Sequence, residues 1–137
     1  MVYLVKWIDS MLFDEQTGLV LVGGSNHTDR KSRRGAATLY LMEIGHQARL
    51  KACRVWDLYS GTVSAIKSYK DFYICATKGS VHILAYSQLT STIDIVRSFG
   101  HHGGMFINDM AVVDRAIVTV SDTDDCLAVS SLDVVCG

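Results

Sequence analysis

The chain has 137 residues, about half of them hydrophobic, and its thirteen Lys and Arg side chains nearly balance its fourteen Asp and Glu side chains. This length suits one domain, for which roughly 100–200 residues is usual. A net charge of −1 excludes a surface that is basic overall, as for nucleic acid, or acidic overall.

Cysteine spacing and hydropathy narrow the class of protein further. The N-terminal stretch meets charges within its first nine residues, so it does not resemble a signal peptide, and no apolar run approaches the ~18 residues of a membrane helix. The cysteines form no Cys-x-x-Cys pair, which predicts reduced thiols rather than a disulfide framework or a zinc site. We therefore expect an intracellular protein without membrane attachment, metal or cofactor. The four cysteines are Cys53, Cys75, Cys126 and Cys136.

The apolar pattern has the period of β-strands along the whole chain. Short runs rich in β-branched and aromatic residues are bounded by Gly, Ser, Asp or Lys-Asp clusters, and no window of eleven residues holds a helical stripe. The pattern predicts an all-β fold. In chain order the runs are Leu19–Val22, Leu39–Ile44, Phe72–Ala76, Val81–Tyr86, Ile93–Val96 and Ile117–Val120.

A four-strand unit, with strands A to D, recurs along the chain. Its strands return every 40–45 residues, which is the signature of β-propeller blades. Stacking around an axis covers the two apolar faces that one blade cannot bury alone. The candidate A strands are Thr62–Tyr69 and Phe106–Val113, and the candidate B strands are Leu19–Gly24, Phe72–Thr77 and Ala116–Ser121. The candidate C strands are Ala37–Ile44, Ser80–Ser87 and Cys126–Asp133, and the candidate D strands are Ala48–Trp56 and Thr92–Phe99.

This repeat predicts a partial, WD40-like propeller of about two and a half to three four-stranded antiparallel blades. Residues 1–57 form the first blade with a polar insertion at 25–35, residues 58–100 form the second, and residues 101–137 form a third that ends before any D strand. The terminal blades lack neighbours, so the chain is expected to self-associate or to need a partner. Val2–Trp7 is an alternative source of a late strand for an incomplete blade.

Five segments, in order and spacing, resemble the CPSF-A family: 18–24, 35–44, 61–66, 78–86 and 117–129. In that family a strand ending in Val-Gly leads through a variable charged loop to a glycine that opens the next strand. Members include the largest subunit of the cleavage and polyadenylation specificity factor, a large subunit of splicing factor 3b and the large damaged-DNA-binding subunit. The resemblance, to a C-terminal propeller segment, implies a nuclear scaffold that holds proteins within an RNA-processing or DNA-repair assembly, with possible RNA or DNA contact.

The alternative is a WD40-type protein-binding module in a cytoplasmic complex. Trp56-Asp57 suggests it, but in WD repeats this dipeptide closes the C strand, whereas here the register places it in a D strand. The candidate C strands end in Glu43-Ile44, Tyr86-Ser87 and Leu132-Asp133, which favours the first hypothesis. His101, after a glycine in a D-to-A loop, is expected to make structural hydrogen bonds.

No catalytic constellation stands out, and we expect no enzyme activity. Cys75 and Cys126, with His101 or His102, are the thiol–imidazole pairs to consider, yet both cysteines alternate with apolar neighbours as inert core thiols do. The acidic run 122–125 lacks the glycine and glutamate of an EF-hand loop and fits a solvated turn.

The best local candidate for a contact is a basic loop in the insertion. Arg30, Lys31, Arg33 and Arg34 place four cations within five positions. Clustered Arg and Lys engage phosphates or an acidic partner. The alternative is a solvated loop whose charges keep the end of the sheet soluble.

Overall fold

The computed structural model of the chain describes residues 7–25, 36–44, 50–60, 62–87, 89–90, 92–100, 102, 107–121 and 127–132. These residues form eleven β-strands, and the described part contains no long helix. The strands are β1 (Trp7–Asp14), β2 (Leu19–Ser25), β3 (Ala36–Ile44), β4 (Leu50–Ser60), β5 (Ala65–Tyr69), β6 (Phe72–Thr77), β7 (Ser80–Ser87), β8 (Thr92–Gly100), β9 (Asp109–Val113), β10 (Ala116–Val120) and β11 (Leu127–Ser131).

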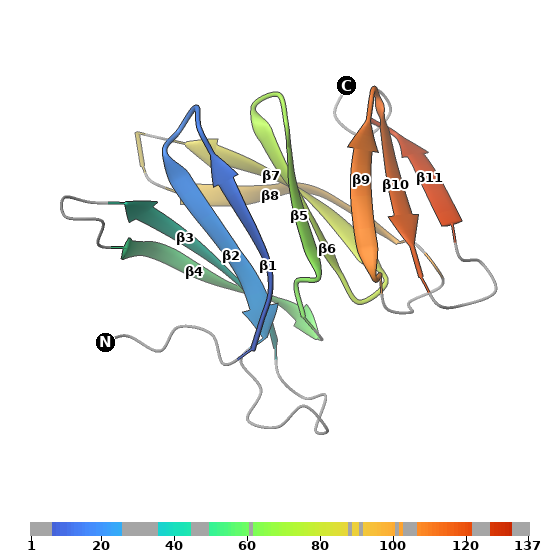
Figure 1. Cartoon of the computed structure of the whole chain (residues 1–137), viewed down its shortest axis with the longest axis horizontal. Helices are drawn as coiled ribbons and strands as arrows, with labels where there is room; N and C mark the ends of the chain where they lie inside the picture. Colours follow the sequence, from blue (N-terminus) through green and yellow to red (C-terminus); the bar gives the residue numbers. More distant parts are fainter. Residues whose placement is uncertain are drawn as a thin grey trace.

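The strands pair into three antiparallel sheets in simple sequential order (Figure 1). The first sheet has the order β1-β2-β3-β4, the middle sheet β5-β6-β7-β8, and the third sheet, within the described residues, β9-β10-β11. Antiparallel neighbours need only short connections, which is why each sheet is a continuous meander. The all-β prediction is confirmed.

The hairpin bounds agree best with the sequence prediction where turn residues punctuate the chain. β6 and β7 span the predicted 72–77 and 80–87, separated by the two-residue turn Lys78-Gly79, in which Gly79 has φ +69°. A positive φ costs glycine little because it has no Cβ. The other predicted strands are present with ends shifted by one to four residues.

One strand was absent from the sequence prediction. β1 supplies the first strand of the first sheet, and its pairing with β2 shifts register between Ile8 and Ser10. Such a bulge breaks the alternation of apolar and polar residues by which a strand is recognised. Met11 and Phe13 are apolar but point outward, with 70 % and 53 % of their surface exposed. This further obscures the alternation of apolar and polar residues in β1.

The middle and third sheets repeat each other closely at their first hairpins. β5 and β9 start 44 residues apart, as do β6 and β10. Both hairpins turn through two residues, and the first residue of each turn, Lys70 or Asp114, has a positive φ of 51° or 55°. The 44-residue spacing of A and B strands therefore corresponds to one recurring backbone unit.

The sheets stack face to face, with the middle sheet covered on both sides. Leu19, Leu21 and Leu39 of the first sheet pack against one face of the middle sheet, which presents Tyr73 and Cys75 among others. The opposite face packs on the third sheet through a second set of buried side chains. That set includes Ile74, Val81, Ile83, Ile107, Met110 and Ile117.

A close backbone approach joins the first and middle sheets. The N–H of Val63 donates to the carbonyl of Gly24 at 3.1 Å, and the Ser10 hydroxyl donates to the carbonyl of Val63 at 2.8 Å. A Cβ on Gly23 would lie 2.5 Å from Ser10 Oγ and 2.6 Å from Val63 Cγ1. The approach therefore depends on glycine at position 23.

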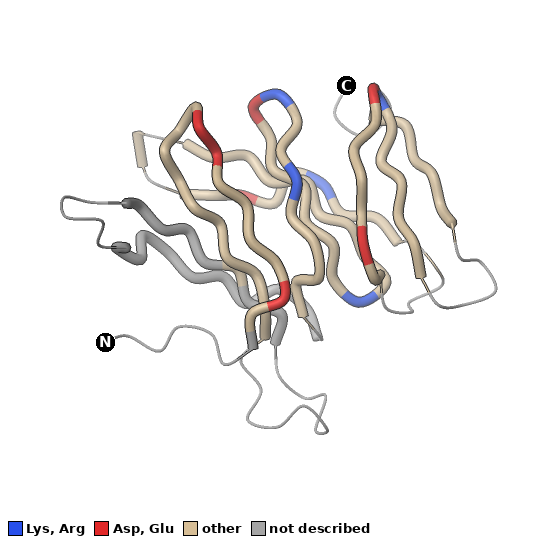
Figure 2. The backbone as a smooth tube through the Cα atoms, in the orientation of Figure 1, with Lys and Arg blue, Asp and Glu red and all other residues tan. Residues whose placement is uncertain are grey.

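The first strands of the three sheets lie next to one another. β1 contacts β5, and β5 contacts β9, whereas the later strands of each sheet diverge (Figure 1). Among the described residues, charged residues lie at the first hairpin turn of each sheet, and others lie within the strands (Figure 2). Because the first strands lie next to one another, the first hairpin turns of neighbouring sheets lie close together.

Candidate functional site

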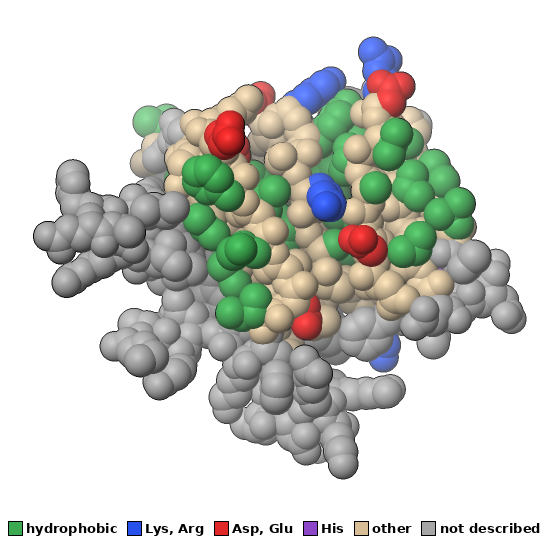
Figure 3. Space-filling model, in the orientation of Figure 1, with side chains coloured by type: hydrophobic (Ala, Val, Ile, Leu, Met, Phe, Trp, Pro, Cys, Tyr) green, Lys and Arg blue, Asp and Glu red, His purple; other side chains and the backbone are tan. Residues whose placement is uncertain are grey.

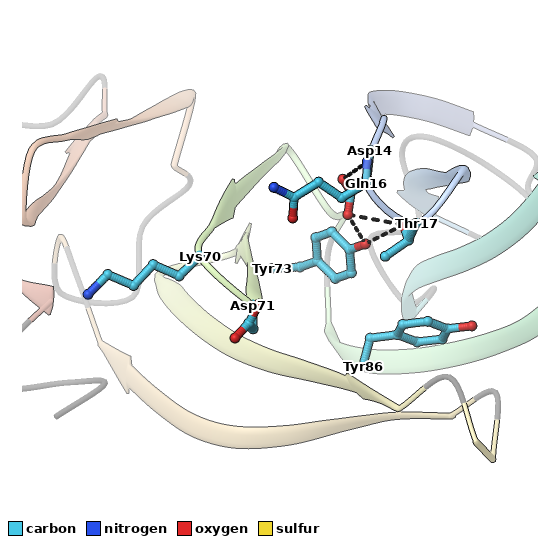
Figure 4. A pocket seen from close by; sticks show the side chains of 7 residues that line it. All are labelled: Asp14, Gln16, Thr17, Lys70, Asp71, Tyr73 and Tyr86. Atoms are coloured by element: carbon cyan, nitrogen blue, oxygen red, sulfur yellow. Dashed lines mark hydrogen bonds between the residues drawn. The ribbon is translucent and has the colours of Figure 1, made fainter.

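A recess of about 310 Å³ opens between the first turns of the first and middle sheets (Figure 4). The β1–β2 turn contributes one wall and the β5–β6 turn another, while β6 and β7 each supply a tyrosine. Pockets for small ligands usually measure about 300–1,000 Å³, so this recess lies at the small end of that range. Its lining residues are Asp14, Gln16, Thr17, Lys70, Asp71, Tyr73 and Tyr86.

Asp14 is held in place by hydrogen bonds from three groups. The Gln16 backbone N–H donates to Oδ1 at 3.0 Å, the Thr17 hydroxyl donates to Oδ2 at 3.0 Å, and the Tyr73 phenol donates to Oδ2. Short polar side chains that bond to the backbone two residues on are typical of such turns. The turn closes through the Gly18 N–H, which donates to the Asp14 carbonyl at 2.8 Å.

These bonds fix the protonation states of the pair. Partial burial raises the pKa of the Asp14 carboxyl, but the hydrogen bonds from Tyr73, Gln16 and Thr17 outweigh burial and hold that pKa below its usual 3.8. Burial, together with the bond to Asp14, raises the pKa of the Tyr73 phenol well above its ordinary value. At neutral pH the recess therefore holds a fixed carboxylate and a neutral phenol.

The charges around the recess are unbalanced. Within the described residues neither Asp14 nor the exposed Asp71 makes an ion pair. The one lysine of the lining, Lys70, extends away from Asp14 (Figure 4), and its ammonium lies 5.2 Å from the centroid of the Tyr69 ring. The interior of the recess is consequently anionic.

Two buried histidines form side-chain bonds inside the sheets. His82 on β7 lies between the Thr77 hydroxyl, 3.0 Å from Nε2, and the Ser98 hydroxyl, 2.7 Å from Nδ1, and burial lowers its pKa. His102 lies in the segment between β8 and β9. Its Nε2 forms a hydrogen bond of 2.8 Å with Thr119 Oγ1. Structural hydrogen bonding was predicted for His101, which lies outside the described residues; its neighbour His102 makes such a bond.

Cys75 is enclosed in the core between the first and middle sheets. It is fully buried, and burial raises the pKa of its thiol to about 12. A thiol that stays protonated and shielded is a poor nucleophile. Cys126, the other thiol considered for pairing with a histidine, lies outside the described residues.

The outer faces of the first and third sheets carry exposed apolar side chains, visible at both ends of the stack in Figure 3. On β1 these are Ile8, Met11 and Phe13. On the third sheet, cross-strand pairs place β9, β10 and β11 side chains on one outer face. The exposed members there are Val113, Val120, Leu127 and Val129, at 37–61 % exposure.

Several predicted features fall elsewhere. The basic loop residues Arg30, Lys31, Arg33 and Arg34 lie outside the described residues, as does the acidic run 122–125. The backbone places Trp56-Asp57 in β4, the fourth strand of the first sheet, and β4 continues to Ser60.

The described residues contain no group of three or more His, Cys, Asp or Glu side chains arranged to hold a metal ion. No helix among them has the length and apolar character to cross a membrane.

The recess could not have been predicted from sequence spacing. Asp14 and Tyr73 are 59 positions apart and meet through the stacking of two sheets. The local signal was the turn Asp14–Gly18, with an Asp followed three residues later by Thr, which is a common turn sequence with no functional meaning of its own.

Comparisons with known proteins bear on the fold. No family model matches the chain, and no curated protein matches it. Among solved structures, the crystal structure of Sqt1 from Chaetomium thermophilum aligns with a TM-score of 0.69 at 16 % identity, over 93 % of this chain. The chain spans about a third of the Sqt1 chain, 33 % of its length. At this identity the likeness shows the fold alone.

Proposed function

We propose that the chain is a non-catalytic protein-interaction scaffold made of consecutive, WD40-like β-propeller blades. Three sequential meanders whose first strands lie side by side support this reading. So does the likeness of the fold to that of Sqt1. In a propeller the first strands surround the axis and each blade packs on the next.

The observation that carries the proposal is the contrast between the middle sheet and the outer two. The middle sheet buries apolar side chains on both faces, whereas β1 of the first sheet and the described strands of the third sheet carry exposed apolar side chains. Contiguous exposed apolar surface on a protein marks an interaction site. The outer faces are therefore the contact surfaces of the scaffold.

The occupant of each outer face is another sheet of the same architecture. Both internal interfaces of the chain are sheet-on-sheet contacts, and β1 and the third sheet present further apolar side chains to solvent. Such a sheet comes from a second copy of the chain. The first sheet of one copy then packs on the third sheet of the next copy, which is a head-to-tail contact that builds rings or open filaments.

Sedimentation velocity over a range of concentrations tests this proposal. Phe13→Lys and Val129→Lys each put a charge on one outer face, at side chains that are 53 % and 61 % exposed, so folding is retained. Leu89→Lys is the control, because Leu89 is 99 % exposed and lies in the β7–β8 turn. We expect the wild type and the control to associate with rising concentration and the combined face variant to stay monomeric. A compact wild-type monomer at all concentrations rejects the proposal.

We further propose, from the resemblance to the CPSF-A family, that the scaffold belongs to a nuclear RNA-processing or DNA-repair assembly. Support comes from the order and spacing of segments such as 35–44 and 78–86. In this reading Arg30, Lys31, Arg33 and Arg34 contact phosphates. Replacing the four by alanine should weaken RNA or DNA binding and reduce its salt dependence. A fluorescent fusion confined to the cytoplasm argues for the WD40-type cytoplasmic module instead.

A further inference from the structure

We propose that the recess between the β1–β2 and β5–β6 turns binds one cationic side chain, lysine or arginine, of a partner polypeptide. The proposal is independent of the outer sheet faces, since the recess is formed within one chain and lies at the hairpin tips. The cationic character of the bound group is inferred from the geometry of Asp14, from the aromatic lining and from the charges at the rim.

The carboxylate of Asp14 retains capacity for one more donor. Oδ2 accepts from the Thr17 and Tyr73 hydroxyls, whereas Oδ1 accepts from the Gln16 N–H. A carboxylate offers about four lone-pair sites, so Oδ1 is open to an N–H donor. Charge-assisted bonds to a carboxylate are about twice as strong as neutral ones. The site is preorganised, because three bonds already hold the group.

The rest of the lining also favours a cation. Tyr86, which is partly buried, contributes an aromatic ring to the lining, and aromatic faces attract ammonium and guanidinium groups. Asp71 adds a second negative charge at the rim. The chain's own lysine does not fill the recess, since Lys70 turns its ammonium toward the Tyr69 ring. An anionic ligand is repelled here, and an apolar one would desolvate Asp14 without offering it a bond.

Small amino-acid amides test the proposal on the full chain by NMR, at concentrations low enough to keep it monomeric. N-acetyl-arginine amide and N-acetyl-lysine amide are titrated, with the citrulline and norleucine analogues as uncharged controls. We expect the amide signals of Gln16, Thr17 and Asp71 to shift, with dissociation constants on the order of 1 mM. A response to arginine, lysine or both supports the proposal and identifies the preferred cation. Equal responses to the uncharged analogues, or none at all, overturn it.

Charge variants separate binding from a merely structural role of the Asp14–Tyr73 link. Asp14→Asn should weaken binding of the cationic amide about ten-fold, because the substitution removes a charge-assisted bond. Asp71→Asn should weaken this binding less, and Lys70→Gln should strengthen it severalfold. The matched control is Asp114→Asn in the β9–β10 turn, which makes the same charge change at the corresponding hairpin of the third sheet. If Asp14→Asn and Asp114→Asn bind alike while both remain folded, the carboxylate is structural and the proposal fails.

Discussion

Gly23→Ala tests the packing of the first sheet on the middle sheet. In an ordinary strand this change removes backbone freedom from the unfolded chain and stabilises the fold by about 0.4–1 kcal/mol. Here the added Cβ meets Ser10 Oγ at 2.5 Å and Val63 Cγ1 at 2.6 Å, distances that require both neighbours to move. Whether Gly23→Ala raises or lowers stability therefore tests the close approach of the first sheet to the middle sheet.

The magnitude follows from two costs. Overpacking by one methyl group costs about 1–3 kcal/mol. Displacing the Ser10 hydroxyl from the Val63 carbonyl costs about 1 kcal/mol more. The expected net loss is about 2 kcal/mol, a large part of the ~5–15 kcal/mol that stabilises a typical domain.

Urea unfolding followed by circular dichroism measures the loss. With a slope of about 1–3 kcal/mol per M for a small protein, the midpoint should fall by about 1 M. Gly100→Ala is the control, because its Cβ would meet the Gly79 carbonyl oxygen at an ordinary 3.7 Å. If Gly23→Ala matches or exceeds wild-type stability, the two sheets do not approach each other as described.

Three further predictions concern single buried or partly buried groups. In mass spectrometry, iodoacetamide should label Cys75 far more slowly in the folded chain than in urea, because the thiol is buried and its pKa is raised to about 12; fast labelling in the native state would place it outside the core. Asp14 has a lowered folded pKa, so its stabilising contribution is present above the usual value of 3.8 and is lost as the pH falls through the folded value. The stability difference between wild type and Asp14→Asn should shrink accordingly in acid, and a constant difference contradicts the assigned hydrogen bonds. Thr119→Val should lower unfolding free energy by about 1 kcal/mol through loss of the bond to His102, as measured by urea unfolding, and an unchanged midpoint would exclude that bond.

Local chemistry explains which parts of the fold were predictable. Lys70-Asp71 and Lys78-Gly79 interrupt apolar runs with residues suited to tight turns, so the limits of β6 were visible in the sequence. β1 was missed because a bulge and outward-facing apolar side chains conceal its alternation. A strand that exposes apolar side chains lacks the alternation of buried apolar and exposed polar residues by which strands are recognised.

The candidate site depended on tertiary contacts that no local pattern contains. Asp14 becomes distinctive through Tyr73, which reaches it from a different sheet. Lys70 leaves the recess anionic by turning toward Tyr69, and side-chain direction at a turn is not encoded in residue type. Residue spacing identified the repeat, whereas the recess arises from the way two repeats stack.

Amide hydrogen exchange at low and high protein concentration tests the scaffold proposal most directly, because it identifies the surface that becomes covered. The proposed contacts predict added protection at high concentration in β1 and in β9 to β11, with the middle sheet unchanged. Exchange that is independent of concentration in these strands, or new protection confined to the middle sheet, would contradict the assignment of the outer faces as interaction surfaces.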